Sequence, residues 1–137
     1  MKILYLVNGS QHAHCYGTDF LYDGFCRVFS FENIFDYPEK PCLHLTGDRD
    51  ECNIDSDQWW PTKNIPIEEI VRQVDIAFMS LGLGEGINLV RHICHNVLPK
   101  NIPIVCFDMT DHVRSLRDFY TSLAGRPLLA YFKREIP

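Results

Sequence analysis

The hydrophobic residues of this chain follow two alternating patterns from the N-terminus onward. Short runs rich in aliphatic, β-branched and aromatic residues are typical of strands. Such runs predict strands over residues 2–8, 32–37, 75–81, 103–108 and 127–132. Between them, apolar residues recur every three or four positions, as on the buried side of a helix. This spacing predicts helices over residues 18–30, 66–74, 87–98 and 112–124.

Several predicted helix ends carry capping signals. Thr18 followed by Asp19 is typical of an N-cap and an acidic first turn. Pro66 suits the first position of a helix, where no backbone donor is needed. Gly125 follows the last predicted helix directly and is typical of a C-cap.

The order of these segments predicts the fold class. Strands that alternate with helices form mostly parallel sheets, and right-handed crossovers place the helices on both faces. We therefore expect an α/β fold, with residues 1–137 as a single three-layer doubly wound domain of about five mostly parallel strands, Rossmann- or flavodoxin-like. The chain ends just after a predicted strand, which suggests the N-terminal part of a longer protein.

Residues 39–64 interrupt the alternation. The segment is polar and acidic, and we interpret it as a long loop insertion. Loops of this length are uncommon in compact domains and are often functional. Trp59 and Trp60 lie near its end, and we expect them to hold the loop against the body of the domain.

Composition excludes several classes of function. The net charge of −5 over 137 residues argues against a nucleic-acid binder and against docking on anionic membranes. No apolar run reaches the roughly 18–20 residues that span a bilayer, and the first residues lack the features of a signal peptide, so we expect a cytoplasmic protein. The six cysteines contain no CxxC pair, and we expect reduced thiols rather than disulfides.

Candidate ligand-binding residues follow the predicted strands. In open parallel sheets, ligands bind beyond the carboxyl ends of the strands. The candidates after the first and third strands are Asn8, Gly9, Ser10, His12, His14, Ser80, Gly82, Gly84 and Gly86. The three glycines form a GxGxG turn before a helix, where the backbone can approach a ligand. A tight turn without any ligand explains the same pattern.

The best acid–base group follows the fourth predicted strand. Asp108, Asp111 and His112 lie close together there, and a histidine beside carboxylates can titrate near neutral pH. These three residues are the candidate catalytic group. Asp111 as the N-cap of the next helix is the alternative interpretation.

Metal ligands are present in type but not in the usual spacing. His12, His14 and Cys15 are close in sequence, and so are Cys42, His44 and Cys52, yet no CxxC or HxxxH pattern joins them. We therefore predict no metal and no cofactor. We interpret His92 and His95 as an exposed pair on one helix face, and Asp19 and Asp23 as solvated carboxylates of the first helix.

Two segments resemble a known family. Residues 20–29 (FLYDGFCRVF), which run into residues 33–38 (NIFDYP), resemble the short helix and V-D-Y-P segment at the start of some bacterial glycosyltransferase-like proteins. Residues 131–135 (YFKRE) resemble a Y-F-K-R-E segment of the same group. The resemblance implies the N-terminal Rossmann-like domain of a GT-B type glycosyltransferase, whose second domain holds most of the sugar nucleotide. Catalysis by this chain alone is not expected.

Three hypotheses about function follow. The first is a glycosyltransferase-like N-terminal domain that binds a sugar or nucleotide-related ligand at the strand ends and works with a second domain or a partner protein. The second is a non-catalytic interaction or regulatory module of flavodoxin-like shape that uses the 39–64 loop. The third is a small metal-assisted hydrolase that uses His12, His14, Asp108 and His112.

Overall fold

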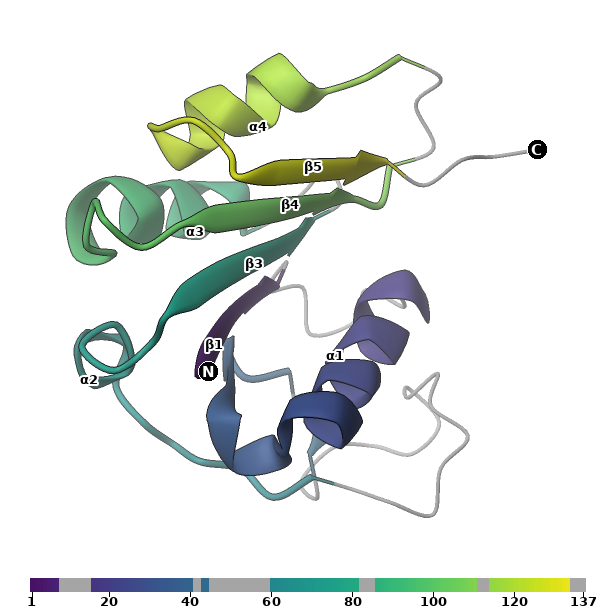
Figure 1. Cartoon of the computed structure of the whole chain (residues 1–137), viewed down its shortest axis with the longest axis vertical. Helices are drawn as coiled ribbons and strands as arrows, with labels where there is room; N and C mark the ends of the chain where they lie inside the picture. Colours follow the sequence, from purple (N-terminus) through teal and green to yellow (C-terminus); the bar gives the residue numbers. More distant parts are fainter. Residues whose placement is uncertain (8–15, 41–42, 45–59, 82–85, 111–113, 134–137) are drawn as a thin grey trace.

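A five-stranded parallel sheet forms the centre of the protein. The computed structural model describes residues 1–7, 16–40, 43–44, 60–81, 86–110 and 114–133 (Figure 1). The strands are β1 (Ile3–Val7), β2 (Ile34–Tyr37), β3 (Ile76–Leu81), β4 (Ile104–Asp108) and β5 (Ala130–Lys133). Their order across the sheet is β2-β1-β3-β4-β5, and all neighbouring pairs are parallel. This order is that of flavodoxin-like doubly wound folds, so the predicted α/β class is confirmed.

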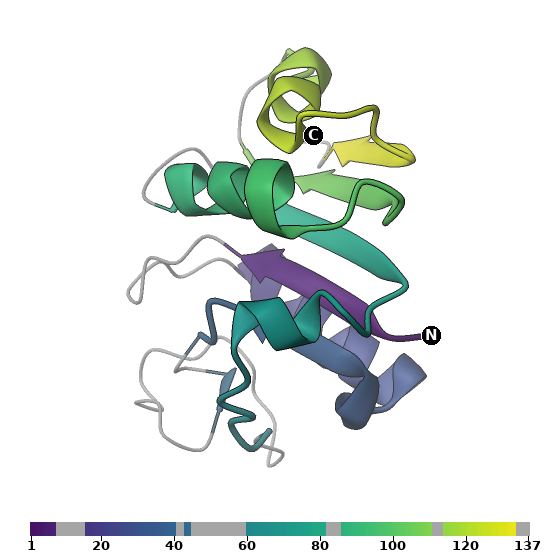
Figure 2. The ribbon, with the colours of Figure 1, turned by 90° about the vertical axis from the view of Figure 1, so that its left-hand side faces the viewer.

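The helices cover both faces of the sheet. Helix α1 (Tyr16–Phe29) lies on one face. The opposite face carries α2 (Ile67–Ile70), α3 (Ile87–His92) and α4 (Arg117–Ala124), as Figures 1 and 2 show together. The crossover from β1 to β2 runs in the opposite direction along the sheet from the later crossovers. Right-handed connections therefore put α1 on the side opposite to α2, α3 and α4.

The core has two layers that share the sheet. Side chains of a strand point alternately to its two faces, so Leu4 and Leu6 of β1 pack with α2, α3 and α4. Ile3 and Tyr5 of the same strand pack with α1 instead. Burial of every β1 side chain explains why the segment is apolar without alternation.

Several element bounds differ from the prediction. Helix α1 begins at Tyr16, so Thr18 lies within the first turn and is not an N-cap. A 3₁₀ turn, η1 (Phe31–Asn33), precedes β2. Helix α4 begins at Arg117 rather than at residue 112, and β5 lies at residues 130–133 rather than 127–132. Gly125 ends α4 in the left-handed region, at φ +64°, so the predicted C-cap is confirmed.

The predicted helix over residues 87–98 changes character halfway along. It is α-helical only to His92 and continues as a π-helical turn, η4 (Ile93–Val97). The guanidinium of Arg126 donates hydrogen bonds to the carbonyl oxygens of Cys94 and Leu98 at 2.7 and 2.9 Å. It also donates to the carbonyl of Pro99 at 2.6 Å. These bonds satisfy carbonyls that a helix end leaves without partners.

Candidate functional site

Buried polar side chains collect at the carboxyl edge of the sheet. Among the described residues, those that are buried and polar or charged are Thr18, Asp19, Asp36, Lys40, His44, Ser80, Asp108 and Thr110. Each lies at the end of a strand, in the segment after it or in the first turn of α1. Burying polar groups is costly unless they find partners. Their concentration at one edge therefore marks this edge as the candidate functional site.

Asp108, at the end of β4, is surrounded by donors. Its Oδ1 accepts hydrogen bonds from the backbone N and the Oγ1 of Thr110, at 3.0 and 2.6 Å. Its Oδ2 accepts one from the Tyr131 hydroxyl at 2.5 Å and one from Lys133 Nζ at 3.3 Å. Burial works to raise the pKa of Asp108, but the donors outweigh burial and lower it. Asp108 is thus a carboxylate that orients its neighbours.

A pocket of about 320 Å³ opens between α1 and the ends of β4 and β5. The residues that line it are Gly17, Leu21, Phe107, Asp108, Met109, Phe132 and Lys133. The rings of Phe107 and Phe132 stack on each other, at an interplanar angle of 17° with centroids 5.2 Å apart, and form the aromatic side of the pocket. Gly17 allows α1 to approach closely, since a Cβ there would lie 2.8 Å from the Met109 sulfur.

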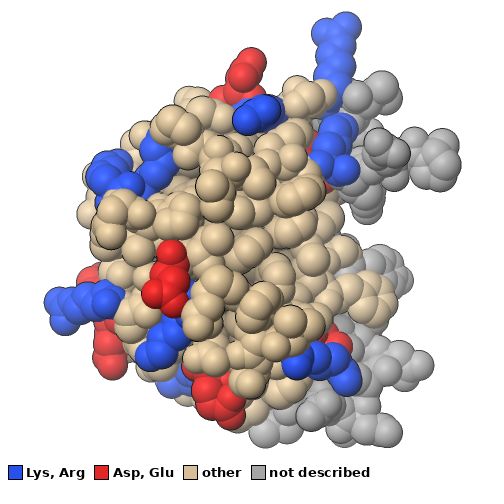
Figure 3. Space-filling view, in the orientation of Figure 1, with Lys and Arg blue, Asp and Glu red and all other residues tan. Residues whose placement is uncertain are grey.

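The pocket combines an apolar wall with charge at one end. Phe132 is 54% exposed although it is a large apolar residue. The Lys133 ammonium lies at the same rim, 3.5 Å from the carbonyl oxygen of Thr110. Figure 3 shows a broad uncharged surface across the middle of the molecule, with charged side chains mainly at its margins. The pocket therefore offers a ligand an aromatic ring and a lysine amine at its rim.

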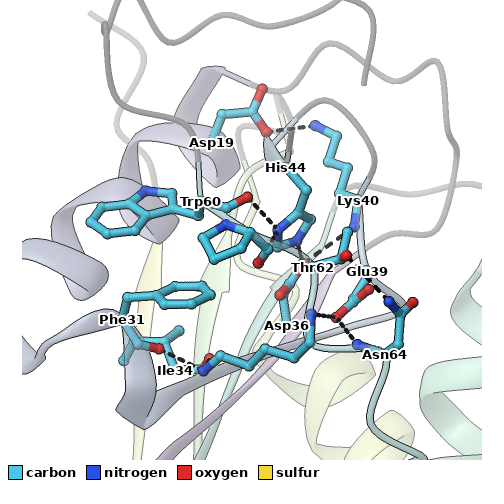
Figure 4. A network of polar contacts seen from close by, with 12 residues as sticks. Asp19, Phe31, Ile34, Asp36, Glu39, Lys40, His44, Trp60, Thr62 and Asn64 are labelled. Carbon is cyan, nitrogen blue, oxygen red and sulfur yellow. Dashed lines mark hydrogen bonds and ion pairs between the residues drawn. The ribbon is translucent and has the colours of Figure 1, made fainter. Parts of the chain in front are cut away.

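A second polar group lies at the end of β2 (Figure 4). His44 is fully buried, and its Nε2 lies 2.9 Å from Oδ2 of Asp36. Its Nδ1 lies 3.2 Å from the carbonyl oxygens of both Trp60 and Pro61. Burial works against the charged ring, but the hydrogen bond and charge of Asp36 outweigh it and raise the pKa of His44.

The described part of the 39–64 segment is tied to this group. Lys40 is 5% exposed, and its Nζ lies 2.5 Å from Oδ1 of the fully buried Asp19. Glu39 Oε1 accepts hydrogen bonds from the backbone N of Lys63 and of Asn64, at 2.8 and 2.9 Å. The ring of Trp60 stacks on Phe31 at 5.3 Å, which agrees with the expected anchoring role of this tryptophan.

The structure places only some of the predicted site residues. Ser80 lies at the end of β3, and its hydroxyl is 2.9 Å from that of Thr18 on α1. Gly86 precedes α3 at φ +95°, which suits glycine. Asp108 is placed as described above. The predicted residues outside the described part of the chain are Asn8, Gly9, Ser10, His12, His14, Gly82, Gly84, Asp111 and His112, together with Cys15, Cys42, Cys52 and Trp59.

Other predictions are confirmed or wrong. Neither Asp19 nor Asp23 is solvated: Lys40 pairs with Asp19 below the surface, and Asp23 is only 13% exposed and pairs with Arg27. His92 and His95 are exposed, as expected. Cys26, Cys94 and Cys106 are buried free thiols, as expected of reduced cysteines. Sequence reasoning missed the roles of Lys40 and Lys133, since a lysine after a strand carries no signal of its burial or its partner.

Two general observations complete the description. Within the described ranges, no helix has the length and apolar character that crossing a bilayer needs. Comparisons of the chain with protein-family models, with curated proteins and with solved structures found no match.

Proposed function

We propose that the chain is a glycosyltransferase-like N-terminal domain that binds a sugar or nucleotide-related ligand in the pocket between α1 and the ends of β4 and β5. The observation that supports this most is the pocket itself, where two stacked aromatic rings lie beside a lysine at the carboxyl edge. In doubly wound folds this edge is where ligands bind.

Three of the lining residues have a defined role in the proposal. Phe132 is 54% exposed and offers a ring on which a nucleobase or a sugar ring stacks, a contact worth about 1–3 kcal/mol per base. Lys133 supplies a cation and donors for a phosphate. Asp108 holds Lys133 and Tyr131 in place from beneath. Because its pKa is lowered, Asp108 serves as a positioning group and not as a proton donor.

The proposal is tested by thermal shift with UDP, GDP, UDP-glucose, GDP-mannose and simple glycans. A ligand at 100 times its Kd stabilises the folded state by about 2.7 kcal/mol. For a domain of this size, that stabilisation raises Tm by on the order of 8 °C. We expect such a shift with at least one of the nucleotide probes.

Matched variants locate the binding. Phe132→Ala should weaken nucleotide binding by roughly 5- to 100-fold because the stacking ring is lost. Lys133→Met should weaken it by roughly 10- to 100-fold because a charge-assisted hydrogen bond is lost. Phe20→Ala and Lys100→Met remove an exposed aromatic and an exposed lysine outside the pocket and serve as controls. Nucleotide binding that is equal in all four variants would reject this pocket. A lack of shift with every probe would favour an interaction module instead.

A further inference from the structure

Three side chains at the end of β2 offer metal-ligating atoms to a common point (Figure 4). One atom each from Asp36, Glu39 and His44 lies within 4.8 Å of the others. Asp36 is 3% exposed and His44 is fully buried, and Glu39 is half-buried. The group is therefore unlike the solvated acidic clusters that are common on protein surfaces.

The Tyr22 hydroxyl provides an independent observation. Tyr22 is fully buried on α1, and its hydroxyl has no hydrogen-bond partner in the described part of the chain. Its ring packs edge-on against His44, with centroids 5.8 Å apart. Burial raises the pKa of Tyr22, and the negative charge of Asp36 raises it further. A buried donor without a partner is costly, so a hydrogen bond from the Tyr22 hydroxyl to Asp36 would stabilise this group.

The ligands are already oriented from behind. The carbonyl oxygens of Trp60 and Pro61 both lie 3.2 Å from Nδ1 of His44, which favours the proton on that nitrogen and turns Nε2 toward the carboxylates. Metal-bound histidines are held by this kind of carbonyl contact on the other ring nitrogen. Two backbone amides fix Oε1 of Glu39, and Oε2 is the oxygen that remains for a metal.

We propose that Asp36, Glu39 and His44 bind a zinc ion, with Tyr22 as the positioning residue that donates to the Asp36 carboxylate. Zinc accepts imidazole nitrogens and carboxylate oxygens as ligands, and three protein ligands leave a fourth position open. Zinc takes the place of the proton on Nε2 of His44, and that proton is released to solvent. The inference is independent of the nucleotide pocket.

The experiment titrates chelator-treated full chain with zinc by calorimetry, and with cobalt by visible absorption. We expect one equivalent of either metal and a cobalt spectrum with nitrogen and oxygen ligands. Glu39→Gln keeps an amide oxygen for the two backbone donors but removes the charge, and it should weaken zinc at least tenfold. His44→Gln should abolish the site. Tyr22→Phe should weaken zinc binding roughly 10- to 100-fold, as the loss of a hydrogen bond to a metal ligand typically does.

The control is His92→Gln, which removes an exposed histidine on α3 and should leave zinc binding unchanged. Circular dichroism of each variant shows whether it is folded. Three results would each overturn the proposal: no binding by the parent chain up to 1 mM metal (roughly the weak limit of a specific site), equal affinity in folded Glu39→Gln, or loss of binding in His92→Gln.

Discussion

The ion pair between Lys40 and Asp19 allows a direct test of how the carboxyl edge is held together (Figure 4). The two side chains are 5% and 0% exposed, and their charged atoms lie 2.5 Å apart. Lys40→Met keeps most of the aliphatic volume but leaves the Asp19 carboxylate buried without its cation. Removing one partner of a buried pair costs about 3–5 kcal/mol, so we expect a loss of that size in the free energy of unfolding.

That loss is large enough to measure by two routes. For a chain of 137 residues, 1 kcal/mol shifts Tm by about 3–4 °C, so Lys40→Met should lower Tm by roughly 10–17 °C. In urea, with a slope of about 2 kcal/mol/M, the midpoint should fall by roughly 2 M. Circular dichroism at 222 nm follows both transitions.

Two further variants separate charge from packing. Asp19→Asn combined with Lys40→Met removes both charges and should recover about 2 kcal/mol of the loss, since no charge then stays buried. Arg27→Met breaks the Arg27–Asp23 pair on the same helix, in which Arg27 is 51% exposed, and should have a much smaller effect. A Lys40→Met variant as stable as the parent, or a double variant whose effects simply add, would refute the reasoning.

Further expected outcomes concern His44, Gly125 and the buried thiols. Because the pKa of His44 is raised in the folded state, protonation of this residue stabilises the fold. The stabilisation is fully present below the unfolded pKa near 6.5 and is lost as pH rises through the folded pKa. Urea titrations with a chelator should show the free energy of unfolding fall over this range, and His44→Gln should not show the fall. Gly125→Ala should lower the free energy of unfolding by about 1–2 kcal/mol from the left-handed φ alone. It should lower it further because the new Cβ would lie 2.7 Å from the His95 ring. Thermal melts of the same substitution in a His95→Ala background separate the steric cost from the backbone cost. Burial raises the pKa of Cys94 to about 11 and that of Cys106 to about 12, so iodoacetamide should label both only after unfolding, as peptide mass mapping can verify.

The fold was largely predictable because its signals are local. Continuous apolar runs marked all five strands, and helical spacing marked α1, α3 and α4 to within a few residues. The π-helical turn was not predictable, since it depends on Arg126, far away in sequence, which binds carbonyls around it. The order of the strands in the sheet was not predictable either, because it depends on long-range contacts that the spacing of apolar residues does not reveal.

The site was predictable only where a strand end fixes it. Ser80 and Asp108 were expected at the carboxyl edge because each closes a strand. Asp19 was expected to be solvated, since a polar residue spaced four from Asp23 resembles an exposed helix face. Its burial arises from Lys40, which reaches α1 from the segment after β2. Ion pairs of this kind follow from the tertiary fold, and the sequence around neither residue predicts them.

Helix α1 separates the two proposed binding points. At 3.6 residues per turn, Gly17 and Leu21 lie on one side of it and line the pocket, while Tyr22 projects from an adjacent side toward His44. Zinc and nucleotide therefore share no ligand residue, and each can be measured without the other. A change in zinc affinity when UDP is added would have to pass through α1, and its size would give the coupling free energy between the sites. Equal zinc affinity with and without UDP would mean that α1 is held rigidly by its core contacts with β1.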